Sequence, residues 1–211
     1  EHTDCDADGT VVYVAVGRTY AGHIVIADEL KPDAREAIAD LKALGVEQVV
    51  MLTGDNETIA RSIAAQTGID TVYAELLPEE KVAKVEEIAA GLPDGRRLAF
   101  VGDGINDAPV LMRADVGIAM GALGSDAAIE AADVVLMDDR MTGVGDAVRV
   151  SRHTRSVVLQ NIALALIVKA VFLTLGAFGI ATMWEAVIAD MGTSLLAVLN
   201  ATRTLRYSRR R

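Results

Sequence analysis

A long apolar run near the carboxyl end of the chain restricts its fold more than any other feature. Val157–Ile180 is a run of about 24 residues, and after a turn around Ala181–Trp184 a second, shorter run follows at Ala186–Leu199, interrupted chiefly by Asp190. The polar side chains inside the first run are Gln160, Asn161, Lys169 and Thr174. A helix of the first run's length crosses a bilayer core of about 30 Å. We therefore predict a transmembrane helical hairpin, with spans at about 157–180 and 183–200. The alternative is a buried helical pair in a soluble protein.

Arginines flank the predicted hairpin at both ends. They are Arg149, Arg152 and Arg155 before it, and Arg203, Arg206 and Arg209–Arg211 after it. Because Lys and Arg are enriched on the cytoplasmic side of membrane spans, both ends are expected there, with Trp184 at the far interface. We accordingly predict a multi-pass plasma-membrane protein in contact with the lipid bilayer. The membrane part is expected at 149–211 and ends in a basic tail. This tail and residues 1–148 are expected in the cytoplasm.

Charge divides the chain into the same two parts. Residues 1–148 carry 28 acidic and 11 basic side chains, a net charge of −17, whereas residues 149–211 carry a net charge of +7. The acidic part lacks the basic surface of a nucleic-acid-binding domain, so no nucleic-acid partner is expected. Cys5 is the only cysteine, which excludes a disulfide within the chain and a cysteine-based metal site.

The acidic part alternates predicted strands with predicted helices. A β-hairpin is expected at Val11–Val16 and His23–Ile26, and helices at Asp33–Leu44, Glu57–Gln66 and Pro78–Ala90. Further strands are expected at Val49–Leu52, Thr71–Ala74, Leu98–Val101, Val116–Ala119 and Val134–Met137. Such alternation is typical of an α/β fold, a parallel sheet with helices on both faces. In these folds the chemistry gathers at the carboxyl ends of the strands.

A loop rich in Gly, Asn and Asp follows one of these strands directly. Gly102–Pro109 reads G-D-G-I-N-D-A-P and contains two carboxylates, Asp103 and Asp107, and the amide of Asn106. Carboxylate and amide oxygens at the end of a buried strand are suited to hold a hard cation such as Mg²⁺. The same composition is also that of an ordinary surface turn, so the loop indicates a metal site only if further functional residues are expected beside it.

Two other segments supply such residues. Thr53-Gly54-Asp55-Asn56 follows the predicted strand Val49–Leu52, and Lys81 lies in the first turns of the helix that Pro78 begins. A hydroxyl, an ammonium group and metal-binding carboxylates at one sheet edge are the groups that phosphoryl transfer needs. Taken singly, Lys81 is typical of a solvated surface lysine and Thr53 of a helix cap. Together with the loop at Gly102, they favour a phosphoryl-transfer site.

Four motifs in this order give the acidic part a family resemblance. T-G-D-N, P-E-E-K, G-D-G-I-N-D-A-P and M-G-A-L-G-S-D at Met120–Asp126 resemble the phosphorylation domain of P-type ATPases, within the haloacid dehalogenase superfamily. The resemblance implies a Rossmann-like, haloacid-dehalogenase-like domain at 27–148 that uses ATP and Mg²⁺. It implies that 1–26 is the end of a nucleotide-binding region with an entry hairpin.

The same resemblance implies roles for individual residues. Thr53, Gly54, Asp55, Lys81 and Asn106 would form the catalytic set, and Asp103, Asp107, Gly102 and Gly104 the Mg²⁺-binding set. Thr53 would hydrogen-bond an aspartyl phosphate, Lys81 would neutralise its charge, and Asp55 would position the nucleotide-binding domain.

The nucleophile that the family requires is absent from the sequence. The phosphorylated aspartate lies in D-K-T-G-T, which does not occur here, so we expect it in a missing N-terminal part of the same pump. Asp6-Ala7-Asp8-Gly9-Thr10 matches the superfamily's D-x-D-x-T but lacks a preceding apolar strand. The alternatives are a membrane-tethered phosphatase that uses Asp6 and a truncated, non-catalytic partner of an intact pump. The chain alone is not expected to hydrolyse ATP.

Two ionisable side chains occur inside the predicted spans. Counted from the turn, Lys169 lies roughly 18 Å deep and Asp190 roughly 12 Å, so the two side chains could pair across antiparallel helices. One interpretation is a salt bridge that holds the hairpin together. The other is a site for a divalent ion. Asn161 with Lys169, and D-M-G at Asp190–Gly192, resemble the zinc-, cadmium- and lead-exporting branch, which implies that Asp190 is a ligand of the transported metal and Lys169 its counterion.

Overall fold

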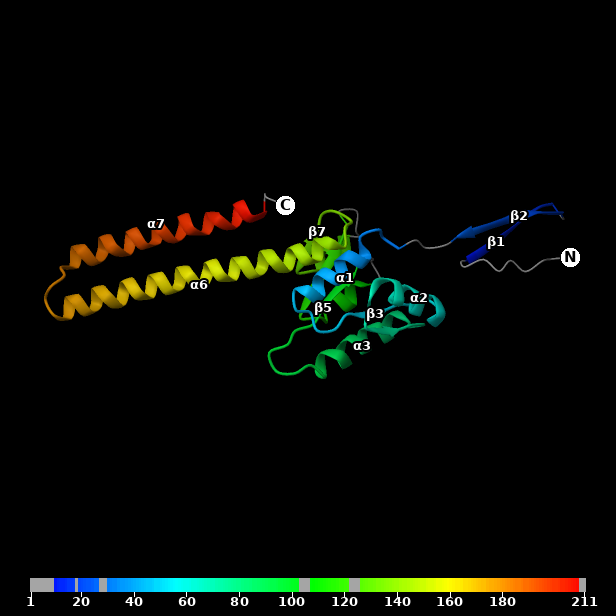
Figure 1. Cartoon of the computed structure of the whole chain (residues 1–211), viewed down its shortest axis with the longest axis horizontal. Coiled ribbons are helices and arrows are strands. Elements are labelled where there is room, and N and C mark those ends of the chain that lie inside the picture. Colours follow the sequence, from blue (N-terminus) through cyan, green and yellow to red (C-terminus); the bar gives the residue numbers. More distant parts are fainter. Residues whose placement is uncertain (1–9, 18, 27–29, 103–106, 122–125, 209–211) are drawn as a thin grey trace.

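The computed structural model of the chain describes residues 10–17, 19–26, 30–102, 107–121 and 126–208 (Figure 1). An α/β body lies in the middle of an elongated molecule. Two long antiparallel helices extend from one side of the body and a β-hairpin lies on the other. The α/β class and the apolar helix that follows it are as the sequence predicted.

The body contains parallel strands in two groups. β3 (Val50–Leu52) pairs with β4 (Thr71–Tyr73), and β5 (Ala99–Gly102), β6 (Val116–Met120) and β7 (Val134–Leu136) form a sheet in that order. The helices are α1 (Ala34–Ala43), α2 (Glu57–Thr67), α3 (Pro78–Ala90), α4 (Ala108–Leu111) and α5 (Asp126–Ala131). All predicted strands of the body are present within one residue of their expected bounds. The helices α4 and α5 are not predicted from the sequence, because helices this short show no amphipathic period.

The core of the body lies around the central strand β6. Ile118, Ala119 and Met120 are buried, and Val110 and Leu111 of α4 pack against the same region with only 1% of each side chain exposed. Gly117 makes this approach possible, since a Cβ atom there would lie 2.8 Å from the carbonyl oxygen of Leu111. Burial of α4 against β6 fixes the position of the loop between β5 and α4, where the candidate site lies.

The β-hairpin carries apolar side chains that nothing in the described part of the chain covers. β1 (Thr10–Val16) and β2 (Thr19–Ile26) pair antiparallel, with an irregularity between Val14 and Ala15. Val12 and Ile24 are opposite one another and are 43% and 57% exposed. A two-stranded hairpin is marginal by itself in water, so a surface of this kind indicates packing against further protein.

A single helix connects the body to the apolar region. α6 runs without a break through 36 residues, Thr142–Ala177, and α7 (Met183–Ser208) returns beside it. The predicted first span begins only at residue 157, because hydropathy marks where the apolar side chains begin and not where the helix begins. Within the described residues, α6 alone is long and apolar enough to cross a membrane. The acidic side chains Glu185 and Asp190 lower the hydropathy of α7.

Candidate functional site

The end of strand β3 presents a hydroxyl and a carboxylate that bond to each other. Thr53 is 8% exposed, and its Oγ1 donates a hydrogen bond to Asp55 Oδ2 at 2.6 Å. The Asp55 amide donates back to Thr53 Oγ1 at 3.1 Å, so the turn is closed by its own side chains. Asn56 then begins α2, its side chain accepting a hydrogen bond from the amide of Thr58. The predicted helix-cap role therefore falls to Asn56, which leaves Thr53 and Asp55 at the strand end.

The end of strand β5 presents the second half of the site. Gly102 ends β5 and Asp107 precedes α4. A Cβ atom on Gly102 would lie 2.8 Å from Asp107 Cβ and 3.0 Å from Asp107 Oδ2. A glycine is therefore required for this carboxylate to lie against the strand end. Asp103, Gly104 and Asn106 lie outside the described residues.

Lys81 joins these segments from the first turn of α3. Its Nζ lies 3.6 Å from Asp107 Oδ1, and the two side chains are 22% and 16% exposed. α3 begins where the sequence predicted, with Pro78 in its first turn and the Glu80 carboxylate accepting a hydrogen bond from the Leu77 amide. Lys81 is thus paired and half-buried, which argues against the interpretation of a solvated surface lysine.

The donors at this edge match a hard cation in type. A carboxylate oxygen such as Asp107 Oδ is the ligand that Mg²⁺ prefers in proteins. Among the described residues no group of three His, Cys, Asp or Glu side chains gathers around one point. Asp107 and Gly102 are the described members of the implied Mg²⁺ set, and Asp107 is the one of the two that carries a carboxylate. The neighbouring Lys81 places a positive charge beside this carboxylate.

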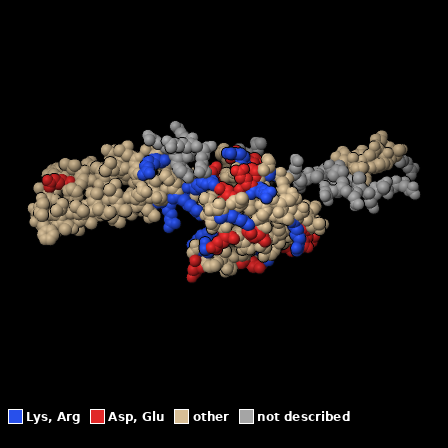
Figure 2. All heavy atoms as spheres, in the orientation of Figure 1, with Lys and Arg blue, Asp and Glu red and all other residues tan. Residues whose placement is uncertain are grey.

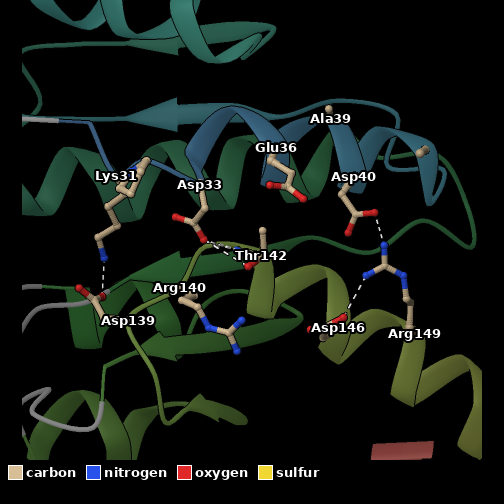
Figure 3. Close-up of a pocket in the computed structure, with 12 residues that line it drawn as sticks. Lys31, Asp33, Glu36, Ala39, Asp40, Asp139, Arg140, Thr142, Asp146 and Arg149 are labelled. Atoms are coloured by element: carbon tan, nitrogen blue, oxygen red, sulfur yellow. Dashed lines mark hydrogen bonds and ion pairs between the residues drawn. The ribbon is translucent and has the colours of Figure 1, made fainter. Parts of the chain in front are cut away.

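A second cluster of charged residues joins α1 to the start of α6 (Figure 3). Asp33 accepts hydrogen bonds from the amide and the hydroxyl of Thr142, at 3.0 and 3.2 Å, and so caps α6 from a distant segment. Arg149 pairs with Asp40 of α1 and, at 3.1 Å, with Asp146 of its own helix. These contacts line an open groove of about 960 Å³. They fix the first two turns of α6 to the body.

Burial and packing make this junction sensitive to small changes. The Arg149 and Asp40 side chains are only 20% and 24% exposed. A Cβ atom on Gly145 would lie against Asp40 Oδ2. The hydrogen bond from the Thr142 amide, helped by the Thr142 hydroxyl, lowers the pKa of Asp33 below its usual 3.8, although burial opposes the shift. The contacts of Asp33 and Asp40 with α6 are not predictable from the sequence, because the partners are more than a hundred residues apart in the chain.

The two long helices bring together the ionisable residues inside the apolar region. Lys169 Nζ lies 3.4 Å from Asp190 Oδ1, which is the pairing across antiparallel helices that the sequence indicated. Nearer the body, the Asn200 amide donates to Asn161 Oδ1 at 2.9 Å, and the Asn161 amide donates to the Ala197 carbonyl. Asn200 was not among the predicted residues, although an amide near the end of an apolar run is a recognisable signal.

Comparison with known proteins places these features in a family. The chain belongs to the haloacid dehalogenase-like hydrolases, whose family model matches residues 1–115. It is 61% identical over 204 residues to the zinc-transporting ATPase of Synechocystis sp., covering 96% of this chain and 28% of the relative. It is 60% identical over 198 residues to the cadmium, zinc and cobalt-transporting ATPase of Bacillus subtilis, covering 94% of this chain and 28% of the relative.

A solved structure resembles most of the described architecture. The crystal structure of a zinc-transporting PIB-type ATPase in its E2.Pi state has a TM-score of 0.79 and 41% identity, covering 94% of this chain and 32% of that one. The chain thus spans less than a third of the length of these relatives. The predicted resemblance to a heavy-metal-transporting P-type ATPase is confirmed, and cobalt is added to the metals for which relatives are named.

Proposed function

We propose that this chain is the phosphorylation domain and the last membrane hairpin of an ATP-driven exporter of Zn²⁺ or Cd²⁺. The observation that best supports this proposal is that two features occur in the same chain. The Lys81–Asp107 pair lies at the strand ends and the Lys169–Asp190 pair lies inside the hairpin, in a chain similar to zinc- and cadmium-transporting ATPases. Zn²⁺ and Cd²⁺ are named for these relatives and also belong to the branch that the hairpin motifs resemble, so they are the ions we propose first, with Pb²⁺ as the third ion of that branch.

At the strand ends, this chain would receive and stabilise a phosphoryl group. Lys81 would neutralise charge on the phosphate, and the Thr53 hydroxyl would exchange its bond to Asp55 for one to a phosphate oxygen. Asp107, with Asp103 and Asn106, would hold Mg²⁺, which would supply positive charge to the phosphoryl group when it is bound. Asp55, freed by that exchange, would contact the nucleotide-binding domain.

The remaining catalytic parts would come from outside this chain. An aspartate in D-K-T-G-T, the ATP-binding surface and further membrane helices are expected in the N-terminal part of the same pump. The uncovered β-hairpin supports a further domain on that side, since its exposed side chains include Val16 and Tyr20. The whole pump would be a multi-pass protein of the plasma membrane. Residues 1–148 and the basic tail would lie on the cytoplasmic side of that membrane.

Helix α6 would carry movement from the phosphorylation site to the membrane. It is continuous from Thr142, where Asp33 caps it, to Lys169, which pairs with Asp190. A rigid helix fixed at its base transmits rotation of the body to a side chain far along its axis.

Asp190 would bind the transported cation as a carboxylate ligand. When the cation leaves, the ammonium group of Lys169 would take its place as the partner of Asp190.

The proposal is tested on the complete pump in metal-stimulated ATPase assays. Asp190→Ala is expected to abolish stimulation by Zn²⁺ and Cd²⁺, because the carboxylate ligand is lost. Glu185→Ala is the matched control, since Glu185 is an acidic residue of the same helix that bonds only to Thr182 among the described residues. Full zinc stimulation in the Asp190 variant would remove the ligand assignment.

A further inference from the structure

The end of the hairpin nearest the body carries exposed arginines that pair with no carboxylate of the described residues. Arg152 and Arg155 of α6 and Arg203 of α7 are exposed. Among the described residues, Arg152 and Arg155 pair with no carboxylate, and Arg203 donates a hydrogen bond to the Asn200 amide oxygen at 3.1 Å. We call these three residues the basic collar. In Figure 2, blue atoms gather where the helix pair meets the body.

The collar differs from arginines on the surface of the body. Arg61, Arg97 and Arg113 are also exposed, but each lies within 4 Å of a carboxylate, those of Glu57, Asp115 and Glu86. The positive charge of these three is therefore largely neutralised within the body. The positive charge of the collar is therefore available to a partner outside the described residues.

The helix register places the collar in one thin layer. Asn161 and Asn200 bond across the hairpin, so residues near 161 on α6 lie level with residues near 200 on α7. At about 1.5 Å per residue, Arg203 then lies level with residue 158, so Arg152, Arg155 and Arg203 fall within about 9 Å along the hairpin axis. The headgroup layer on each side of a bilayer is about 5–8 Å thick. Because a long Arg side chain can extend along the helix towards the headgroups, all three guanidinium groups can reach one such layer.

The apolar part of α6 sets where that layer lies. From Val157 to Ala177 the helix is about 30 Å long, which matches the hydrocarbon core of a bilayer. Arg155 stands immediately outside this segment, on the side of the body. A membrane that covers the apolar segment therefore brings lipid phosphates level with the collar.

We propose that the basic collar binds the headgroups of anionic phospholipids in the leaflet that faces the body. Guanidinium groups donate paired hydrogen bonds to phosphate oxygens, and each basic residue near an anionic surface adds roughly fivefold to the affinity. The ligand class is a phosphatidylglycerol-like lipid with a net negative charge. This inference rests on the proposed membrane hairpin but not on the transported ion or on ATP.

The test counts lipids that stay bound to the 211-residue chain. The chain is purified in detergent micelles with equal phosphatidylcholine and phosphatidylglycerol, and native mass spectrometry measures the ratio of the two retained lipids. The wild type is expected to enrich phosphatidylglycerol. The triple variant Arg152→Gln, Arg155→Gln and Arg203→Gln is expected to lose that enrichment by at least tenfold.

A matched variant separates the collar from overall charge. Arg61→Gln, Arg97→Gln and Arg113→Gln together change the net charge equally and are expected to keep the enrichment. Equal retention by the collar variant, or equal loss in the matched variant, would overturn the inference and leave the proposed function intact. Collar-dependent binding of duplex DNA in place of the lipid would also overturn it. Complete extraction of the chain from vesicles by alkaline carbonate would overturn the membrane hairpin itself.

Discussion

At the scale of single residues, the candidate site depends on how closely Asp107 approaches the end of β5. Gly102→Ala would place a Cβ atom 2.8 Å from Asp107 Cβ, so the carboxylate has to move. We expect the Mg²⁺ concentration for half-maximal ATPase activity of the complete pump to rise at least tenfold. Gly91→Ala is the control, because the nearest atoms to its Cβ lie at an ordinary 3.6 Å. An unchanged Mg²⁺ requirement in the Gly102 variant would remove Asp107 from the metal set.

Another residue-scale prediction concerns Asp33 and pH. Its folded pKa is lowered chiefly by the hydrogen bond from the Thr142 amide, so its stabilising contribution is fully present above the usual pKa of 3.8. The contribution is lost as the pH falls through the lower, folded pKa. Asp33→Asn keeps a side-chain acceptor but loses the charge, so at neutral pH it should cost less unfolding free energy than the roughly 1 kcal/mol of a completely lost helix cap.

Thermal unfolding of the 211-residue chain across a pH series checks this expectation. The difference between the wild type and Asp33→Asn should be constant near neutral pH and shrink in acid. Glu36→Gln, which changes an exposed carboxylate in the first turn of α1, is the control and should show no comparable loss. A difference that grows as the pH falls would contradict the assigned direction of the pKa shift.

At the scale of elements, the contact between α1 and α6 is the feature that couples the body to the hairpin. Gly145→Ala would press against Asp40 Oδ2 and displace its pairing with Arg149. Both Gly145→Ala and Arg149→Gln are expected to lower metal-stimulated ATPase activity several-fold. Because both act on one contact, the double variant should be no worse than Arg149→Gln alone.

The neighbouring glycine of α6 provides the control for that prediction. Gly143→Ala adds the same methyl group in the same helix, but its nearest neighbour is a Leu136 methyl at an ordinary 3.4 Å. It should retain nearly full activity. Strictly additive losses in the Gly145 and Arg149 double variant would show that the two residues act independently.

Elements of this chain could be predicted from the sequence to different degrees. Strands such as β3 and β6 and the helix begun by Pro78 were predictable, since apolar runs and a first-turn proline are local signals. The pairing of Lys169 with Asp190 followed from counting residues on two antiparallel helices. The cap of α6 by Asp33 was not predictable, because it depends on tertiary packing between segments far apart in the chain.

At the scale of the whole molecule, the chain combines an acidic α/β body with an apolar hairpin joined by one continuous helix. The proposed phosphate-binding groups lie in the body, and the charged pair lies far along α6 and α7. In the proposed pump, neither part would support ATP-driven transport without the other. The central claim is therefore that occupancy of the metal site controls phosphorylation in the body.

Phosphoenzyme formation in the complete pump tests that claim most directly. The pump is incubated with ATP labelled on its terminal phosphate, quenched in acid, and assayed for protein-bound label that hydroxylamine releases. The account predicts labelling that depends on Zn²⁺ or Cd²⁺ in the wild type, and no metal-dependent labelling in Asp190→Ala. Equal labelling with and without these ions, or full metal-dependent labelling of the Asp190 variant, would contradict it.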